Sequence, residues 1–233
     1  MSITLTELLA SRDARVEHQK ELAEKYPRAS LICFTVMLPG SVKRDWRSLL
    51  IADAGVVAIR QVFGRFGHLA SPQKKIIFYD GAQKTNFLLR TGPSREMPGS
   101  SSVMPDLIGH LNSVISTEVE KSLLLYQEER DLETGFEAYF VVDMPALEVK
   151  RLCCSIEDEH PLGRLMDIDV VCHFDRSGEI SLKPLSREDI GLPARHCLLC
   201  NKPARECMRA HRHSPEEIQD TIDRMVQDYK FSK

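Results

Sequence analysis

The chain has 233 residues, which is the length of one domain or of one domain with a small appendage. Hydrophobic residues make up 42% and charged residues 28%, and this ordinary globular composition excludes collagenous, disordered and disulfide-scaffold proteins. The 31 Lys and Arg residues against 34 Asp and Glu residues give a net charge of −3, which argues against a general polyanion binder. Any basic surface must therefore be local.

Neither a membrane span nor a secretory leader is expected. No apolar run approaches the roughly 18 residues that a membrane span requires. The first thirty residues mix charged side chains through an amphipathic pattern, with no uninterrupted apolar segment. The seven cysteines are an odd number, and three of them lie within 197–207, which indicates metal binding in a reducing compartment more readily than disulfides. We therefore expect a cytoplasmic protein.

The first part of the chain predicts a helix, a strand, a second helix and a second strand. Apolar residues at helical spacing with charges between them predict an amphipathic helix over 6–26. Residues 31–38 are rich in β-forming side chains and run into a Pro-Gly turn, which is typical of a strand. A second helical pattern covers 43–66, and a short apolar run at 76–79 predicts another strand.

The middle of the chain changes in composition. Gly, Pro, Ser and Thr dominate 91–105, which is typical of a loop, and helical periodicity follows over 106–132. Gly135 breaks this pattern. A buried strand is expected at 136–142 and a helix at 145–154.

The last part of the chain predicts a hairpin and a Cys/His-rich tail. Two β-type runs, 165–174 and 179–182, flank a Gly-containing connection. A closing helix is expected at 215–229. We therefore divide the chain into a catalytic domain over 1–190 and a tail over 191–233.

An Asp-x-Asp pair is the most informative feature of the sequence. In a strand, Asp167 and Asp169 project to one face because side chains alternate with period two. Two carboxylates so close repel each other unless a divalent cation neutralises them, and Mg²⁺ suits this role because it accepts phosphate oxygens as further ligands. Metal-dependent nucleotidyl transfer needs this arrangement, with Arg164 placed to neutralise phosphate charge. A solvated strand face is the alternative for so short a motif.

The cysteines of the tail have the spacing of a zinc site. Cys197 and Cys200 place two thiolates on one turn, and Cys207 with His211 or His213 can complete the tetrahedron that zinc prefers. A site with four protein ligands leaves no position for a catalytic water, so its role would be to fold a short, loop-rich tail. Idle thiols with surface histidines are the alternative.

The same tail contains a cluster of basic residues with a single glutamate among them. Such a patch, fixed by a metal, is a natural contact for phosphate or for an acidic partner, and a solubilising surface is the alternative. The basic residues are Arg195, Lys202, Arg205, Arg209 and Arg212.

Four blocks of the sequence resemble one known family. They read ELLASRDAR at 7–15, FTVMLPGSVK at 34–43 and HPLGRLMDIDV at 160–170, with LSR…LPARHCLLC and the later CMR and His beyond residue 185. Together they are similar to the holo-acyl-carrier-protein synthases of citrate lyase, also called phosphoribosyl-dephospho-coenzyme A transferases (CitX type).

The resemblance implies a reaction. A 2′-(5-triphosphoribosyl)-3′-dephospho-coenzyme A donor would transfer its phosphoribosyl-dephospho-coenzyme A group to a serine on the acyl-carrier subunit of citrate lyase, releasing pyrophosphate. Asp167 and Asp169 would hold Mg²⁺ or Mn²⁺, and Arg164 would contact the donor's phosphates. Asp169 itself or Glu157 would take the serine proton.

Further positions in the matching blocks have a phosphate-binding interpretation. The basic ones, for which an ordinary ion pair is the alternative, are Arg12, Arg15, Lys43, Arg187 and Arg195. Gly40 and Gly163 would let the backbone approach phosphate or turn sharply. The stretch of about 71–134 is longer than the family pattern, and we interpret it as an insertion that recognises a different carrier protein or mediates self-association.

The fold that we expect is α+β, a nucleotidyltransferase-like mixed sheet with flanking helices and a zinc-stabilised C-terminal tail. The expected partners are the acyl-carrier subunit and the donor; a membrane and nucleic acid are not expected. Two other functions stay open at this point. One is a nucleotidyltransferase that acts on a different protein acceptor, and the other is a non-enzymatic zinc-knuckle binding module.

Overall fold

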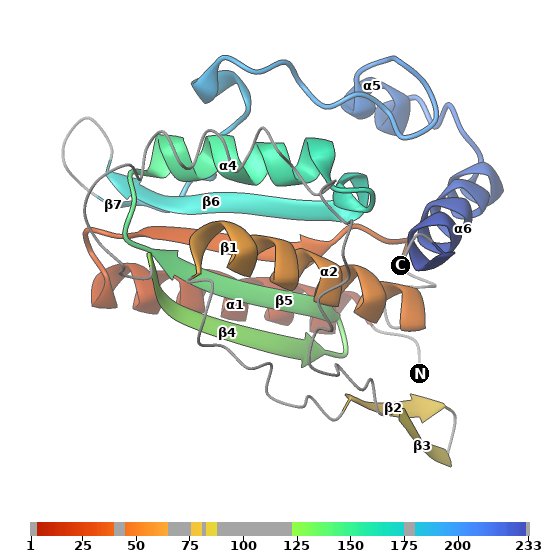
Figure 1. The fold of residues 1–233 in the computed structure, drawn as a ribbon, viewed down its shortest axis with the longest axis horizontal. Coiled ribbons are helices and arrows are strands. Elements are labelled where there is room, and N and C mark those ends of the chain that lie inside the picture. Colours follow the sequence, from red (N-terminus) through yellow and green to blue (C-terminus); the bar gives the residue numbers. More distant parts are fainter. Residues whose placement is uncertain are drawn as a thin grey trace, which may run out of the picture. The chain divides into compact units, whose positions relative to one another are not determined.

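The structure is a computed structural model of the chain (Figure 1). The chain divides into two compact units, Met1–Gly64 with Lys121–Lys233, and Arg65–Glu120. The second unit contains an antiparallel hairpin of β2 (Ile76–Asp80) and β3 (Gln83–Phe87), so the strand expected at 76–79 is confirmed. The residues that the structure describes are 4–39, 45–64, 76–80, 83–87, 123–174 and 180–231.

The first unit is built on an antiparallel sheet with the strand order β4-β5-β1-β6-β7. The expectation of a mixed sheet is wrong, because β1 lies between two strands that both run against it and a tight turn joins β4 to β5. Four strands are long, and two-residue β7 extends the sheet beside β6. The strands are β1 (Ser30–Val36), β4 (Leu124–Leu132), β5 (Gly135–Val142), β6 (Met166–Phe174) and β7 (Ile180–Ser181).

Three helices cover the two faces of this sheet. In Figure 1, α1 (Leu5–Lys25) lies behind it, while α2 (Trp46–Phe63) and α4 (Ala146–Glu159) lie in front. A capping box between Thr4 and Glu7 starts α1. These three helices confirm the predictions over 6–26, 43–66 and 145–154, although α4 continues five residues beyond its predicted end.

The two faces have separate apolar contacts. On the α1 face, Leu22 and Ala23 pack with Leu31 of β1. On the opposite face, Phe34 lies so close to Gly55 of α2 that a Cβ added there would come within 2.3 Å of its ring. Leu31 and Phe34 are an odd number of positions apart in β1, so their side chains point to opposite faces of the sheet, as the alternation of a strand requires.

The helix expected over 106–132 is wrong at its C-terminal end, where β4 forms. This strand lies at the edge of the sheet and has polar side chains on both of its faces. Charged side chains of the helices on either side of the sheet pair with them. His18 of α1 lies 2.9 Å from Glu128, and Arg60 of α2 lies 3.0 Å from Glu129. The alternation typical of a half-buried strand is therefore missing from the sequence. Residues 106–122 and the loop expected at 91–105 lie outside the described residues.

The C-terminal part follows the sheet with one short and one long helix. The 3-10 helix η2 (Gly163–Leu165) leads into β6, and η3 (Glu188–Ile190) follows β7. Then come α5 (Ala204–Arg209) and α6 (Pro215–Phe231), the latter confirming the closing helix. Among the described helices, none combines the length and the apolar character needed to cross a membrane.

Candidate active site and metal-binding cluster

The paired aspartates lie on the α1 face of the sheet. In the register of β6 with β1, Asp167 is opposite Thr35 and Asp169 is opposite Cys33. The Cys33 thiol accepts a hydrogen bond from Gln19 of α1 at 3.3 Å, which places this row of side chains on the α1 face. Side chains directly opposite in a ladder share a face, so both carboxylates lie on that side, as the alternation predicted. Both are partly exposed, and 40% of the Asp169 side chain is accessible.

The two carboxylates influence each other. Burial and the neighbouring charge of Asp167 raise the pKa of Asp169. Lys150 of α4 opposes this shift, since its Nζ lies 3.9 Å from Asp169 Oδ1 and also donates to the Ile168 carbonyl at 3.3 Å. Lys150 is buried, and sequence reasoning missed it. The signal that would have found it is a lysine inside the apolar stripe of a helix, beside Val149.

Glu157 lies at the outer edge of β6, the side of this strand that faces away from β1. The carboxylate accepts a hydrogen bond from the Ile168 backbone N–H at 2.9 Å and pairs with Arg195. Arg187 Nη1 lies 3.6 Å from its second oxygen. Burial raises the pKa of Glu157, and Arg195 opposes that shift. These contacts bind the strand edge to α4, while a role for Glu157 as general base stays a prediction.

The rest of the outer edge of β6 is hydrogen-bonded in the same way. Arg195 donates to the Met166 carbonyl at 3.1 Å, and the Leu185 N–H donates to the Val170 carbonyl at 2.9 Å. Together with Glu157, these groups satisfy backbone positions that another strand would otherwise pair.

Three arginines of the predicted site come together near the start of β6. Arg187 donates to Asp158 at 2.6 Å, and Arg195 to Glu157, so both form ion pairs. Arg164 instead donates to the backbone carbonyl of His196. Burial and the neighbouring charge of Arg195 lower the pKa of Arg164, while Asp158 opposes that shift.

Arg15 lies on α1, the helix that covers the same face of the sheet as the aspartates, and pairs with a buried carboxylate. Its Nε and Nη2 atoms lie 2.9 and 2.5 Å from Glu137 Oε1, and the Tyr139 hydroxyl donates to the other oxygen at 2.7 Å. Glu137 is opposite Thr35, which is also opposite Asp167, so these residues form one row across three strands. Sequence reasoning missed Glu137, because nothing local distinguishes it from other strand residues.

The remaining predicted phosphate contacts are more scattered. Arg12 is exposed on α1. Gly40 and Lys43 lie outside the described residues. Gly163 packs against the end of α4, where an added Cβ would come within 2.5 Å of the Glu157 carbonyl oxygen and 2.6 Å of that of Ile156. A close backbone approach thus requires glycine at this position.

The Cys/His tail brings four predicted ligands together. The ligand atoms of Cys197, Cys200, Cys207 and His213 all lie within 4.8 Å of one another. Of the two histidines that the spacing left open, the structure selects His213; His211 is exposed, with a left-handed backbone (φ 42°). The Nε2 atom of His213 is buried without a hydrogen-bond partner, which fits a metal ligand.

The thiols of this cluster differ in acidity. Burial opposes ionisation of Cys197, but the backbone N–H groups of Leu199 and Cys200 outweigh it and lower the pKa of Cys197 to about 7. The Cys200 and Cys207 sulfur atoms are 3.5 Å apart. Three sulfurs and one nitrogen form a donor set that can hold a metal ion such as zinc.

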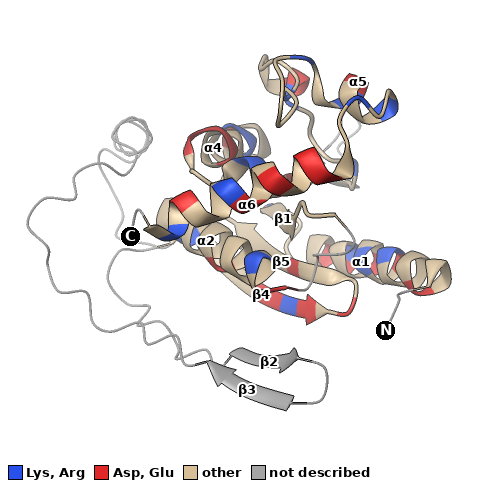
Figure 2. Ribbon diagram, turned by 90° about the vertical axis from the view of Figure 1, so that its right-hand side faces the viewer, with Lys and Arg blue, Asp and Glu red and all other residues tan. Residues whose placement is uncertain are grey.

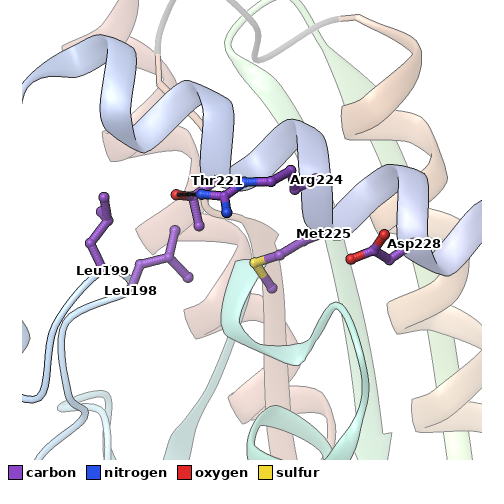
Figure 3. A pocket seen from close by; sticks show the side chains of 6 residues that line it. All are labelled: Leu198, Leu199, Thr221, Arg224, Met225 and Asp228. Atoms are coloured by element: carbon purple, nitrogen blue, oxygen red, sulfur yellow. Dashed lines mark hydrogen bonds between the residues drawn. The ribbon is translucent and has the colours of Figure 1, made fainter.

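A cavity of about 390 Å³ lies between the Cys/His loop and α6 (Figure 3). Leu198 and Leu199 reach it from the loop, and the remaining lining side chains come from α6. None of the predicted catalytic residues lines this cavity. The paired aspartates therefore belong to the partly covered face of the sheet and not to this space.

Comparison with known proteins identifies relatives along nearly the whole chain. A probable apo-citrate lyase phosphoribosyl-dephospho-CoA transferase of Vibrio cholerae is 32% identical over 230 residues, which cover 98% of this chain and 94% of that protein. A probable transferase of the same name from Streptococcus pyogenes is 25% identical over 232 residues, which cover 100% of this chain and 89% of that protein. The CitXG protein of Haemophilus influenzae is 41% identical over 104 residues, 45% of this chain and 21% of that protein.

A family model gives the broader match. The model described as apo-citrate lyase phosphoribosyl-dephospho-CoA transferase (CitX) matches residues 3–82 and 85–229. This match spans most of the stretch 71–134, whose interpretation as an insertion stays a prediction. The chain belongs to the family of apo-citrate lyase phosphoribosyl-dephospho-CoA transferases.

Proposed function

We propose that this protein transfers the phosphoribosyl-dephospho-CoA group from 2′-(5-triphosphoribosyl)-3′-dephospho-CoA to a serine of the acyl-carrier subunit of citrate lyase. The serine oxygen forms a bond to the α-phosphorus of the donor, the bond to the β-phosphate breaks, and pyrophosphate leaves. The observation that carries this proposal is the pair of partly exposed carboxylates on one face of β6, in a chain of this family. The reaction would follow the nucleotidyltransferase pattern.

The two aspartates suit a divalent cation. Asp167 and Asp169 offer oxygen donors from one strand face, and the raised pKa of Asp169 reflects burial and a repulsion that a cation would relieve. Mg²⁺ or Mn²⁺, when bound, would neutralise charge on the donor's phosphates and on the leaving pyrophosphate. Lys150 then helps to hold Asp169 ionised, as its Nζ lies 3.9 Å from that carboxylate.

The other charged groups divide into two sets. Arg164 offers its positive charge to an anion, because its observed partner is a backbone carbonyl and not a carboxylate. Arg15, Arg187 and Arg195 already pair with carboxylates, which supports a positioning role for them. For the serine proton we assign Asp169, since the oxygens of Glu157 face a backbone N–H and two arginines.

The Cys/His cluster would hold a structural zinc ion. All four protein donors are present, so no position remains for a reacting water. The ion would fix the loop that carries Arg195 and His196, and the chemistry itself would take place at the aspartates.

The experiment uses the purified protein with the donor, the apo acyl-carrier subunit and Mg²⁺. Transfer should raise the mass of the carrier by that of the phosphoribosyl-dephospho-CoA group and release one pyrophosphate per carrier. Asp167→Asn should reduce turnover by about 10³-fold or more with the fold unchanged. Asp143→Asn, at an exposed aspartate after β5, is the matched control and should keep full activity. Absence of transfer by the wild-type protein, or full activity of the Asp167 variant, would contradict the proposal.

A further inference from the structure

The short helix α5 and the residues on either side of it include several Lys and Arg residues (blue in Figure 2) that the proposed chemistry does not use. Lys202, Arg205, Arg209 and Arg212 are exposed, and within the described part of the chain none of their side chains forms an ion pair. Unpaired cations gathered on one short segment stand out in a protein whose net charge is −3. We call these four residues, together with Met208, the α5 surface.

The orientation of α5 is set by Cys207. This cysteine is buried and belongs to the Cys/His cluster, so it defines the inward side of the helix. At about 100° per residue, Arg205, Met208 and Arg209 lie on the outward side. Met208 is 70% exposed, so the α5 surface combines positive charge with an apolar side chain.

The α5 surface is connected to the candidate active site by a short chain of hydrogen bonds. The Ala204 N–H at the start of α5 donates to the Arg195 carbonyl at 2.9 Å. The Arg195 side chain in turn donates to the carbonyl of Met166 at 3.1 Å, and the next residue in the chain is Asp167. A partner held on α5 is thus held at a fixed position relative to the start of β6.

The arrangement of these side chains fits a macromolecule. A phosphate site requires donors that converge on one point, whereas these four cations are distributed along the segment, with Lys202 before α5 and Arg212 after it. The exposed Met208 favours a protein over nucleic acid, because apolar side chains surrounded by charge are typical of protein interfaces.

We propose that the α5 surface docks the acceptor protein of the transfer reaction, through acidic side chains that surround an apolar one. This inference rests on the proposed function and adds to it the surface that recognises the acceptor. Opposite charges around the edge of a protein interface mainly raise the association rate and make binding dependent on salt.

The test measures binding and turnover separately with the full-length protein. Arg205→Glu combined with Arg209→Glu should weaken binding of the apo-carrier by about tenfold or more, measured by calorimetry without donor. The KM for the carrier should rise in parallel, while the KM for the donor and the kcat at saturating carrier stay unchanged. The milder pair Arg205→Gln and Arg209→Gln should give a smaller loss in the same direction. Metal content and circular dichroism confirm that each variant retains its fold.

A matched control reverses two exposed cations elsewhere, Arg28→Glu with Arg151→Glu, and should leave carrier binding within twofold of wild type. Equal binding of the carrier by the α5 variants and the wild-type protein would overturn the docking proposal, even if transfer occurs. Binding of an oligonucleotide in place of the carrier, lost in the α5 variants, would also overturn it. Carrier binding that depends on α5, without any transfer, would uphold the surface and contradict the proposed function.

Discussion

Glu157→Gln separates a structural role of this glutamate from a catalytic one. The glutamate is 2% exposed, and its oxygens face the Ile168 N–H, Arg195 and Arg187. Glutamine keeps the shape and can still accept from Ile168, but it removes the charge that compensates two arginines. We therefore expect the folded variant to be less stable than the wild-type protein and to keep measurable turnover.

The size of the effect follows from burial. Removing one partner of a buried ion pair costs about 3–5 kcal/mol. Arg195 is 18% exposed, so solvent screens it in part, and the retained hydrogen bond lowers the cost further, to about 2–3 kcal/mol. For a chain of this size, 1 kcal/mol corresponds to about 2–4 °C, so Tm should fall by roughly 4–12 °C.

The assay combines thermal unfolding with the transfer reaction at a temperature where both proteins are folded. Glu148→Gln, at an exposed position of the same helix, is the control and should cost less than about 1 kcal/mol. A variant of Glu157 with unchanged Tm and no turnover would refute the reasoning and identify Glu157 as the general base.

Two further predictions concern packing and metal. Gly163→Ala should destabilise the protein by about 1–3 kcal/mol, measured from the urea midpoint, because its Cβ would meet backbone oxygens at 2.5 and 2.6 Å; an unchanged midpoint would show that the turn adjusts freely. Purified protein should contain one zinc ion per chain, and a strong chelator or Cys200→Ser should remove it and loosen the C-terminal tail, seen as faster proteolysis there. Full metal content in the Cys200 variant would contradict the ligand assignment.

The features that sequence reasoning predicted are those encoded locally. The helices α1 and α6 follow from helical spacing of apolar residues, and the shared face of Asp167 and Asp169 follows from the alternation of a strand. The cysteine spacing likewise predicted that Cys207 and one of two histidines join the first two cysteines in a metal site, and the structure brings Cys207 and His213 to them.

The features it missed depend on residues far apart in the chain. The ion pair of Arg15 with Glu137 joins positions 122 residues apart, and no local pattern indicates it. Strand β4 was predicted as helix because α1 and α2 supply charged partners to both of its faces. The contact of Lys150 with Asp169 exists only because α4 packs along β6.

The outer edge of β6 has a consequence for solubility. Strands with free backbone groups at a sheet edge invite pairing with other molecules and aggregation. Here charged side chains and the segment after β7 occupy those groups, through Glu157, Lys150, Arg195 and Leu185. A chain truncated after residue 182 would lose the hydrogen bonds from Arg195 and Leu185 to this edge. The exposed backbone groups would then promote self-association, although every long strand of the sheet is retained.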